Sequence, residues 1–515
     1  MYSNKEIERE LKKWTIELDE IELMEEISSS PWSKIHRALV RGLEAAVKII
    51  DLEDLEQSIV DNMLREVMIL LQLRNPNIIL LMGVCKTPSK LYIVTEYLQG
   101  SVYHLIKQQQ QLQLNDISLL MDTKRALMVA KDVSLAMNWM HRQSPPMVHL
   151  NLKPSNILYG TNFQIKISDF SLCKVKQGSK LTGQAGSTAY MAPEILQNRE
   201  YNERSDVYSF GISLWAMLTQ RDPYEGMFKS YPEMVGAIEE GVRPPIDQKW
   251  SNRLKDFLYM CWHKNPVQRP SFQEIIDNRM IEGAIIHELL QEDMDSLCFW
   301  KSVAKERTEM GWEEFYHGFV EHLGLDSSVV PLYSKEIKCL KQMLEVGEPD
   351  SNRGTVQLEH FARFTQYFGP ITRHGGMHPL DRMWDVCTMP GFRGAMSTNE
   401  VHSALAGQKK GAYLVRFSFS EKSCYTISYV ASSRSSDIGN IKVLYDGNRA
   451  SYLYKGGKTV YPSFQQLITR HQPKNEPFRE PMHGGPFLAL QLKLPLSTGA
   501  ETVYLAVPPS LFKHI

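Results

Sequence analysis

Three groups of residues have types and spacings that could carry chemistry. The first is an ordered set of polar side chains in the N-terminal half: Lys48, Glu66, Asn151, Asn156 and Asp169. In the second, Glu359 follows Glu348 by eleven residues, which is close to the spacing of a calcium loop. The third is Arg416, inside a short apolar run at 411–418. Lysine and arginine can bind phosphate, and carboxylate and amide oxygens can bind Mg²⁺ or Ca²⁺.

The elements that must position these residues change in kind along the chain. From about 14 to 278, short β-rich runs such as 91–97 alternate with helical patterns such as 125–140. From about 281 to 380 the pattern is helical, and from about 390 it is β-rich again. We predict a multidomain α+β protein with domains at 17–279, 281–380 and 389–482, followed by a β-rich tail at 483–515.

Composition limits the class of protein. The chain has 515 residues, of which 43% are apolar and 23% are charged, with a net charge of −1. This mixture excludes a mostly disordered chain, and the charge balance counts against nucleic-acid binding. Seven scattered cysteines without zinc spacing favour reduced thiols. These thiols lead us to expect a cytoplasmic protein. We expect no transmembrane segment, because the most apolar stretch, 77–85, is too short to span a bilayer.

The motifs of the first region resemble, in their order, the signature set of eukaryotic protein kinases. They are EAAVK at 44–48, HLNLKPSN at 149–156, DFS at 169–171, APE at 192–194, SDVYSFG at 205–211 and Arg269. Trp14-Thr15-Ile16 and Cys261-Trp262 are similar to the tyrosine-kinase-like group of serine/threonine kinases. The resemblance implies a bilobal protein-kinase fold.

The resemblance also implies a nucleotide site for ATP and Mg²⁺. Lys48 would pair with the phosphates and with Glu66. Asp169 and Asn156 would be metal ligands, and Lys153 matches the catalytic-loop lysine. The positions implied to surround adenine are Ile27, Ile35, Ala46, Thr95, Glu96, Leu98 and Leu158.

Several departures count against catalysis. Asn151 replaces the catalytic-loop aspartate, and an amide cannot act as a base near neutral pH. Leu150 replaces the arginine beside it, and Ser171 replaces a glycine after Asp169-Phe170. The three glycines of the phosphate-covering loop are serines, at positions 28, 30 and 33. We predict an impaired kinase domain, a pseudokinase, and leave ATP binding open.

The middle region contains a weak repeat at 311–315 and 357–361, each predicted to be a turn entering an amphipathic helix. A calcium site is one reading. The other, which we favour, is a degenerate EF-hand-like helical segment that binds no calcium, because Arg353 occupies the position where such a loop needs glycine. Similar helical segments precede the phosphotyrosine-binding domain of STAT and Cbl proteins, so we expect this segment to orient the domain that follows.

The run GAYLVRFS at 411–418 resembles the F-L-V-R strand of SH2 domains, which have an antiparallel sheet flanked by two helices. Predicted helices at 397–405 and 464–471 agree with that order. The resemblance implies that Arg416 grips phosphotyrosine and that Ser418 and Ser420 help to cradle the phosphate. Thr398 and Val443 stand at positions where the family has a basic residue and a histidine.

As a whole, the chain resembles the SH2-containing protein kinases of social amoebae. We expect a phosphotyrosine-signalling protein that binds tyrosine-phosphorylated partners and has an impaired kinase domain. The alternative is an active serine/threonine or dual-specificity kinase that its SH2 domain recruits to targets. Contact between the kinase and SH2 domains, recruitment to membrane-associated phosphoproteins, and phosphorylation of Tyr504 are further options; for Tyr504, a plain terminal strand is preferred.

Overall fold

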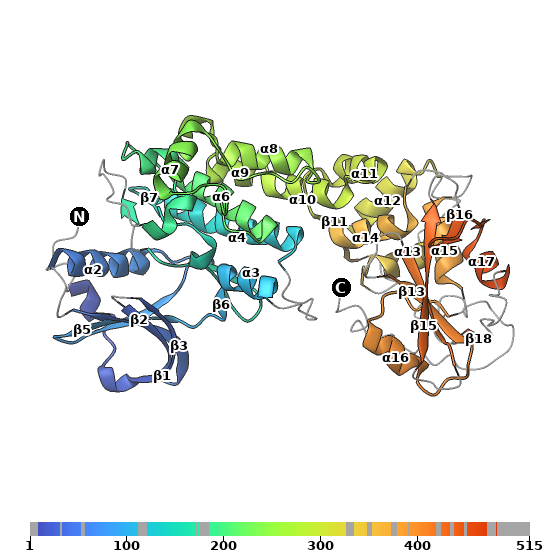
Figure 1. Cartoon of the computed structure of the whole chain (residues 1–515), viewed down its shortest axis with the longest axis horizontal. Coiled ribbons are helices and arrows are strands. Elements are labelled where there is room, and N and C mark those ends of the chain that lie inside the picture. The colour runs from blue at the N-terminus through green and yellow to red at the C-terminus, as the bar shows by residue number, and fades with distance from the viewer. Residues whose placement is uncertain are drawn as a thin grey trace. The chain divides into compact units, whose positions relative to one another are not determined.

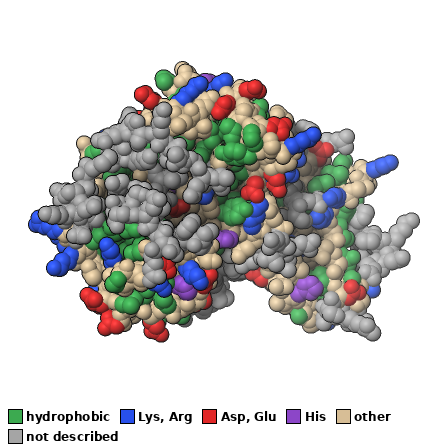
Figure 2. Space-filling view, turned by 60° about the vertical axis from the view of Figure 1, so that its left-hand side comes forward, with side chains coloured by type: hydrophobic (Ala, Val, Ile, Leu, Met, Phe, Trp, Pro, Cys, Tyr) green, Lys and Arg blue, Asp and Glu red, His purple; other side chains and the backbone are tan. Residues whose placement is uncertain are grey.

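The computed structural model describes residues 9–30, 33–52, 57–111, 121–170, 173–175, 185–325, 334–347, 353–371, 378–389, 391–418, 424–432, 437–446, 451–470 and 480–481. The chain divides into two compact units, Met1–Ile285 and Ile286–Ile515 (Figure 1). Acidic and basic side chains are interspersed over the face shown in Figure 2, as the near-zero net charge leads one to expect. No helix among these residues is long and apolar enough to cross a membrane. The predicted tail at 483–515, with Tyr504, lies outside the described residues.

The first unit begins with an antiparallel five-stranded sheet. Its strands, in spatial order, are β1 (Ile21–Ser30), β2 (Ser33–Val40), β3 (Leu43–Asp51), β5 (Lys90–Glu96) and β4 (Leu81–Lys86). Helix α2 (Gln57–Gln72) lies beside the sheet (Figure 1). The sheet forms because alternate apolar residues such as Ala45, Val47 and Val94 are buried in one cluster.

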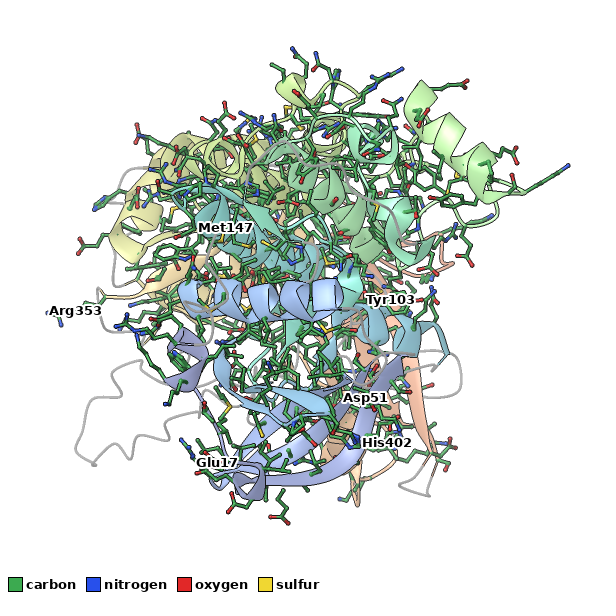
Figure 3. All side chains as sticks on the ribbon, turned by 90° about the vertical axis from the view of Figure 1, so that its left-hand side faces the viewer. Glu17, Asp51, Tyr103, Met147, Arg353 and His402 are labelled. Atoms are coloured by element: carbon green, nitrogen blue, oxygen red, sulfur yellow. The ribbon has the colours of Figure 1, made fainter. Side chains whose placement is uncertain are left out.

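The rest of the first unit is mainly helical. Its helices are α3 (Val102–Gln111), α4 (Thr123–His141), α5 (Pro193–Leu196), α6 (Arg204–Thr219), α7 (Tyr231–Glu240), α8 (Asn252–Cys261) and α9 (Phe272–Asp277), while α10 (Met280–Leu290) begins in this unit and ends in the second. Helix α6 is buried on almost every side, and at Gly211 any Cβ would lie 2.8 Å from the Cβ of Cys261. Figure 3 shows Met147 in this helical lobe and Asp51 in the sheet lobe. The bilobal arrangement confirms the predicted fold class.

Two small sheets of short strands flank the predicted catalytic residues in sequence. One small sheet has the order β6 (Gly100–Ser101), β8 (Ile157–Tyr159) and β9 (Ile165–Ile167). A second pairs β7 (Met147–Val148) with β10 (Lys174–Val175). The predicted catalytic loop lies between β7 and β8, and Asp169 follows β9.

The second unit starts with an aromatic-rich helical segment. Its helices are α11 (Met294–Ala304), α12 (Trp312–His322), α13 (Lys335–Met343), α14 (Leu358–Phe368) and α15 (Pro379–Cys387). Strands β11 (Glu309–Gly311) and β12 (Thr355–Gln357) pair antiparallel, and each leads directly into a helix, α12 or α14. Each copy of the sequence repeat therefore leads into an amphipathic helix, as predicted. The segment before each helix is a paired strand and not the predicted turn. Residues 348–352 of the calcium-like spacing lie outside the described residues.

The remaining part is an SH2-type sheet with a helix on each face. The strand order is β17 (Val460–Tyr461), β16 (Ser451–Tyr454), β15 (Ile438–Asp446), β14 (Cys424–Val430), β13 (Ala412–Phe417) and β18 (Glu480–Pro481). Helix α16 (Thr398–Leu405) packs on the face that contains Leu414, and α17 (Phe464–Arg470) packs on the face that contains Tyr425. Strand β13 has the predicted bounds.

Candidate functional site

The catalytic loop of the first unit is held by one buried carboxylate. Asp206 on α6 is fully buried and accepts hydrogen bonds from the backbone amides of His149 and Leu150, each at 2.8 Å. Its Oδ2 also lies 2.8 Å from Nε2 of His141. Leu150 adopts a φ of 63°, which a non-glycine residue keeps only when its surroundings fix it. The loop is therefore rigidly positioned although Leu150 replaces the usual arginine.

His149 links this loop to the end of β9. Its Nδ1 accepts the backbone N–H of Asn151 at 3.2 Å, and its Nε2 lies 3.2 Å from the carbonyl oxygen of Ser168. Burial lowers the pKa of His149, so the ring is neutral and Nε2 carries the proton that it donates to Ser168. The ring also makes an edge contact with Phe170, at a centroid distance of 5.0 Å.

Three predicted catalytic and metal positions are brought together by hydrogen bonds. Asn151 Nδ2 donates to Oδ2 of Asp169 at 2.8 Å, and Asn156 Nδ2 donates to the backbone carbonyl of Asn151 at 2.7 Å. Asn151 is only 7% exposed, and its Oδ1 has no hydrogen-bond partner among the described residues. A carboxylate at position 151 could not donate to Asp169, so this bond exists because the residue is an amide.

Lys153 adds a positive charge beside Asp169. Burial lowers the pKa of the Lys153 ammonium, and the negative charge of Asp169 acts in the opposite direction. The polar cluster thus contains a carboxylate, a lysine and two amides, and a neutral amide occupies the position that the kinase resemblance assigns to the catalytic base.

Lys48 lies on β3, where its backbone pairs with Ile35 of β2 and Ile93 of β5. Glu66 lies on α2, but its side chain is outside the described set, so the ion pair between the two residues stays a prediction.

The predicted adenine-binding residues occupy neighbouring strands and the connection after β5. Ile35, Ala46, Leu98 and Leu158 are all half-buried. Thr95 pairs with Ala46, and its hydroxyl donates to the Ala46 carbonyl oxygen at 3.4 Å. Ile27 differs, because it lies at an irregularity of β1 and is 49% exposed.

Glu96 has a partner that the sequence analysis missed. Its Oε1 accepts from Lys166 Nζ on β9 at 2.8 Å and from the backbone N–H of Leu80 at 2.7 Å. Lys166 is almost fully buried, and a lysine inside the apolar run IKI was the available signal. The Glu96 carboxylate, at one of the implied adenine positions, is therefore held by Lys166 of β9 and by the backbone of Leu80 just before β4.

The serines that replace the glycine loop lie in the antiparallel hairpin of β1 and β2. Ser28 pairs with Ile35 and Ser30 pairs with Ser33, so β1 and β2 stay paired up to residues 31–32, which are outside the described residues. Among the described positions with positive φ, none is one of these serines. The hairpin therefore does not use the left-handed backbone that glycine would allow.

A buried ion pair stabilises the helical lobe. Arg269 donates from Nη1 and Nη2 to the two carboxylate oxygens of Glu194, at 2.6 and 2.9 Å. Ser205 adds a hydrogen bond at 2.6 Å. Burial alone would raise the pKa of Glu194, but the Arg269 guanidinium and these hydrogen bonds lower it overall, so the carboxylate is ionised.

The second site is centred on Arg416 of β13. Its Nε donates to the Ser428 hydroxyl at 3.3 Å, and its Nη1 donates to the carbonyl oxygen of Met396 at 3.2 Å. Burial lowers the pKa of the guanidinium, which nevertheless stays charged. The structure records no carboxylate partner for Arg416 within the described residues.

The loop expected to cradle phosphate begins at Ser418, which is buried. Its carbonyl oxygen accepts from the Tyr367 hydroxyl of α14 at 3.0 Å, while the Tyr425 hydroxyl donates to the Tyr367 carbonyl at 3.0 Å. The Tyr367 and Phe417 rings stack at 3.9 Å. The helical segment therefore fixes the start of this loop, and Ser420 lies outside the described residues.

The strand register changes one position inferred from the sequence. Val443 is fully buried and pairs with Tyr425, on the α17 face of the sheet. Lys442 pairs with Thr426, which in turn pairs with Arg416, on the opposite face. The residue of β15 on the Arg416 face is therefore Lys442 and not Val443. The motif order in the sequence could not show this, because a shift of one residue exchanges the faces of a strand.

Comparison with known families identifies both domains. The family of protein tyrosine and serine/threonine kinases matches residues 21–278, and the SH2 domain family matches residues 392–471. The chain belongs to the protein kinases that carry a C-terminal SH2 domain. The predicted outer bounds of 17–279 and 389–482 extend slightly beyond the matched residues and stay predictions.

Full-length relatives share this SH2-kinase organisation. The dual specificity protein kinase shkB of Dictyostelium discoideum is 35% identical over 98% of this chain and 75% of its own length. The dual specificity protein kinases shkC and shkA of the same organism are each 30% identical, over 88% and 93% of this chain and 89% and 92% of their own lengths. The resemblance to the SH2-containing kinases of social amoebae is confirmed.

Proposed function

We propose that this SH2-kinase is a phosphotyrosine-signalling protein that acts mainly by binding, with a kinase domain impaired in phosphoryl transfer. The observation that carries the proposal is the bond from Asn151 Nδ2 to Asp169. It fixes the amide as a donor at the position where a base must accept a proton. A positioned general base contributes about 10²–10⁴ in rate, so its loss is a severe defect.

The residues present fit ATP and Mg²⁺. Asp169 offers a carboxylate, and Asn156 uses its Nδ2 on the Asn151 carbonyl, which leaves its amide oxygen for a metal. When bound, Mg²⁺ would neutralise phosphate charge. Lys48 would bind phosphate oxygens, and the half-buried apolar residues would enclose the adenine ring. No calcium role is proposed for the helical segment.

In the SH2 domain, Arg416 would bind the phosphate of a tyrosine-phosphorylated partner. Its present partners, a hydroxyl and a backbone carbonyl, orient the guanidinium without neutralising its charge. Binding of such partners would also recruit the protein to membrane-associated phosphoproteins, or bring the SH2 domain to a phosphotyrosine of its own chain.

The second candidate is an active kinase of dual specificity. Its support is the retention of Lys48, Asn156 and Asp169, together with the names of the relatives. In that case Asn151 would orient the substrate hydroxyl without removing its proton.

Autophosphorylation and ATP/Mg²⁺ binding in wild type, Asn151→Asp and Lys48→Met separate the two candidates. We expect little transfer by wild type. Robust transfer that Lys48→Met abolishes would establish the active kinase. Capture of phosphotyrosyl peptides should disappear in Arg416→Ala, and undiminished capture would refute the assigned pocket.

A further inference from the structure

Helix α4 carries apolar side chains on its outward face as well as on its inner face. The inner face packs against α6 and α9 in the helical lobe (Figure 1). On the outward face, the side chains of Met128, Leu135 and Trp139 are 52%, 40% and 45% exposed. The outward face of a helix that packs on one side normally carries polar and charged residues, so these three need a reason.

The exposed residues form a continuous row along the helix. Together with Asp132 they follow one another at intervals of four, three and four residues, which places all four side chains on one face. We call Met128, Asp132, Leu135 and Trp139 the α4 stripe; it is about 16 Å long, or three helical turns. Single exposed apolar residues are ordinary, but a row that includes a tryptophan is typical of a surface that binds a partner.

The apolar surface continues from the α4 stripe onto neighbouring elements. Leu135 borders a small cleft between α4, α9 and the start of α10, whose other apolar walls are Ile275, Ile276 and Ile281. Lys131 and Glu282 also line this cleft, and their side chains form an ion pair at 3.0 Å. A partner on the stripe would therefore meet apolar side chains beside the helix as well as on it.

Asp132 is the charged group within the α4 stripe, and it is half-buried. Within the part of the chain that the structure describes, its carboxylate forms no ion pair and accepts no side-chain hydrogen bond. Burial raises the pKa of Asp132, and the charge of the adjacent Lys131 acts in the opposite direction. A cation placed next to the carboxylate would favour its charged form and offset its lost hydration.

Basic residues along the helix are engaged with other groups. Lys131 pairs with Glu282, and the Arg125 guanidinium lies over the Phe163 ring at 4.7 Å. At the end of the helix, Arg142 donates to Gln273 at 3.1 Å. The surface complementary to the α4 stripe is therefore an apolar row with one cation near its centre.

We propose that the α4 stripe binds an amphipathic helix of another protein, whose apolar row is interrupted by a lysine or arginine opposite Asp132. Residues spaced three and four apart, over about three turns, are the pattern by which one helix binds the apolar face of another. The inference goes beyond the proposed function, because it involves neither phosphoryl transfer nor phosphotyrosine. It makes the kinase domain a docking platform.

The test uses the full-length chain and a displayed library of amphipathic helical peptides selected on the wild type, with affinity read by fluorescence polarisation. We expect the selected helices to share a lysine or arginine at one position of their apolar row. Trp139→Ala should weaken their binding about thirtyfold, the scale of an interface hot spot, and Asp132→Asn about tenfold. Tyr259→Ala and Asp256→Asn, which change exposed residues of α8, are the matched controls and should bind like wild type.

An exchange of charges tests the pairing directly. Asp132→Lys should abolish binding of the basic helices and should restore binding when the basic residue of the helix is replaced by glutamate. Thermal unfolding of every variant identifies any loss of folding. Leu135→Gln is the second apolar variant, and it decides the case if Trp139→Ala does not fold.

Three outcomes overturn the proposal. The first is that no helix can be selected, or that the selected helices bind Leu135→Gln and Asp132→Lys as tightly as wild type. The second is that the selected helices share no basic residue, which refutes the pairing with Asp132. The third is self-association of the wild type, measured by sedimentation, that Trp139→Ala abolishes, because the stripe would then bind a second copy of this chain. Each of them leaves phosphotyrosine binding by the SH2 domain as it stands.

Discussion

The kinase site and the SH2 pocket are both proposed to bind phosphate, but they differ in how their polar groups are used. In the kinase site the carboxylate of Asp169 accepts from Asn151 within the chain, 2.8 Å away. In the SH2 pocket, Arg416 contacts neutral groups, Ser428 and the carbonyl of Met396. In the first site a hydrogen bond from Asn151 already occupies one oxygen of the Asp169 carboxylate. In the second, the positive charge of Arg416 is not neutralised by its neutral partners and can attract a ligand. Under the proposed function, the kinase scaffold persists while binding is concentrated in the SH2 domain.

The largest expected effect tests whether the kinase scaffold is independent of the SH2 pocket. Arg269→Leu leaves the buried Glu194 carboxylate without its partner and should cost about 3–5 kcal/mol of stability in the first unit. Thermal unfolding measures the loss, and phosphopeptide affinity should not change. Arg41→Gln, which breaks an exposed pair with Glu20, is the control and should hardly change stability, because solvent screens the pair.

The same pair gives the wild type a dependence on pH. The pKa of Glu194 is lower in the folded chain than in the unfolded chain, so its stabilisation is present above the unfolded value and is lost as pH falls through the folded value. Acid unfolding profiles of wild type and Arg269→Leu should therefore converge as pH falls. Parallel profiles would contradict this role of the pair.

Arg416→Lys tests whether the SH2 pocket depends on geometry as well as charge. Lysine keeps the charge but cannot form the planar fork, so phosphopeptide binding should weaken by about 1.5–3 kcal/mol. Isothermal titration measures the change. Retention of full affinity would mean that Arg416 acts only as a point charge.

Asn151→Asp tests whether the hydrogen bond from Asn151 to Asp169 stabilises the kinase site in the absence of metal. It places two carboxylates where a donor and an acceptor now lie 2.8 Å apart, so the variant should lose about 1–3 kcal/mol of stability in EDTA and recover it with Mg²⁺. Thermal unfolding with and without Mg²⁺ measures this without any assay of activity. Asn138→Asp is the control, because Asn138 donates to the neutral Gln273 and its variant should show no recovery with Mg²⁺.

The smallest effect is expected for Tyr367→Phe. The variant keeps the ring stack on Phe417 but loses the bond to the Ser418 carbonyl, which should cost about 1 kcal/mol. Stability of the second unit and phosphopeptide affinity should both fall slightly. Tyr259→Phe, an exposed tyrosine of the first unit, should change neither.

Much of the architecture was predictable because its signals are local. The bounds of β13, the start of α17 and the order of the kinase motifs follow from residue patterns within short windows. The replacement of the catalytic-loop aspartate by Asn151 was also visible in the sequence, since the neighbouring motif residues identify the position. These features depend on few residues, and all of them are neighbours in sequence.

What could not be predicted depends on contacts between distant segments. The face of the sheet on which Lys442 lies follows only from the pairing register of β14 and β15. The hydrogen bond from Tyr367 to Ser418 joins residues 51 positions apart. Lys166 could be noticed in its strand, but its partner Glu96 could not be inferred. The positions of the Glu66 side chain and of Ser420 stay predictions.

The contact of Tyr367 with the SH2 sheet also bears on how the chain can be divided for study. A fragment that starts at residue 389, the predicted edge of the SH2 domain, would expose the Phe417 and Tyr425 rings, which Tyr367 covers in the whole chain. A fragment that starts at residue 280, the first residue of α10, keeps this helix whole and keeps the apolar surface covered, because it contains the entire second unit. The shorter fragment is therefore expected to aggregate on expression, and the longer one is the better choice for screening phosphopeptide libraries.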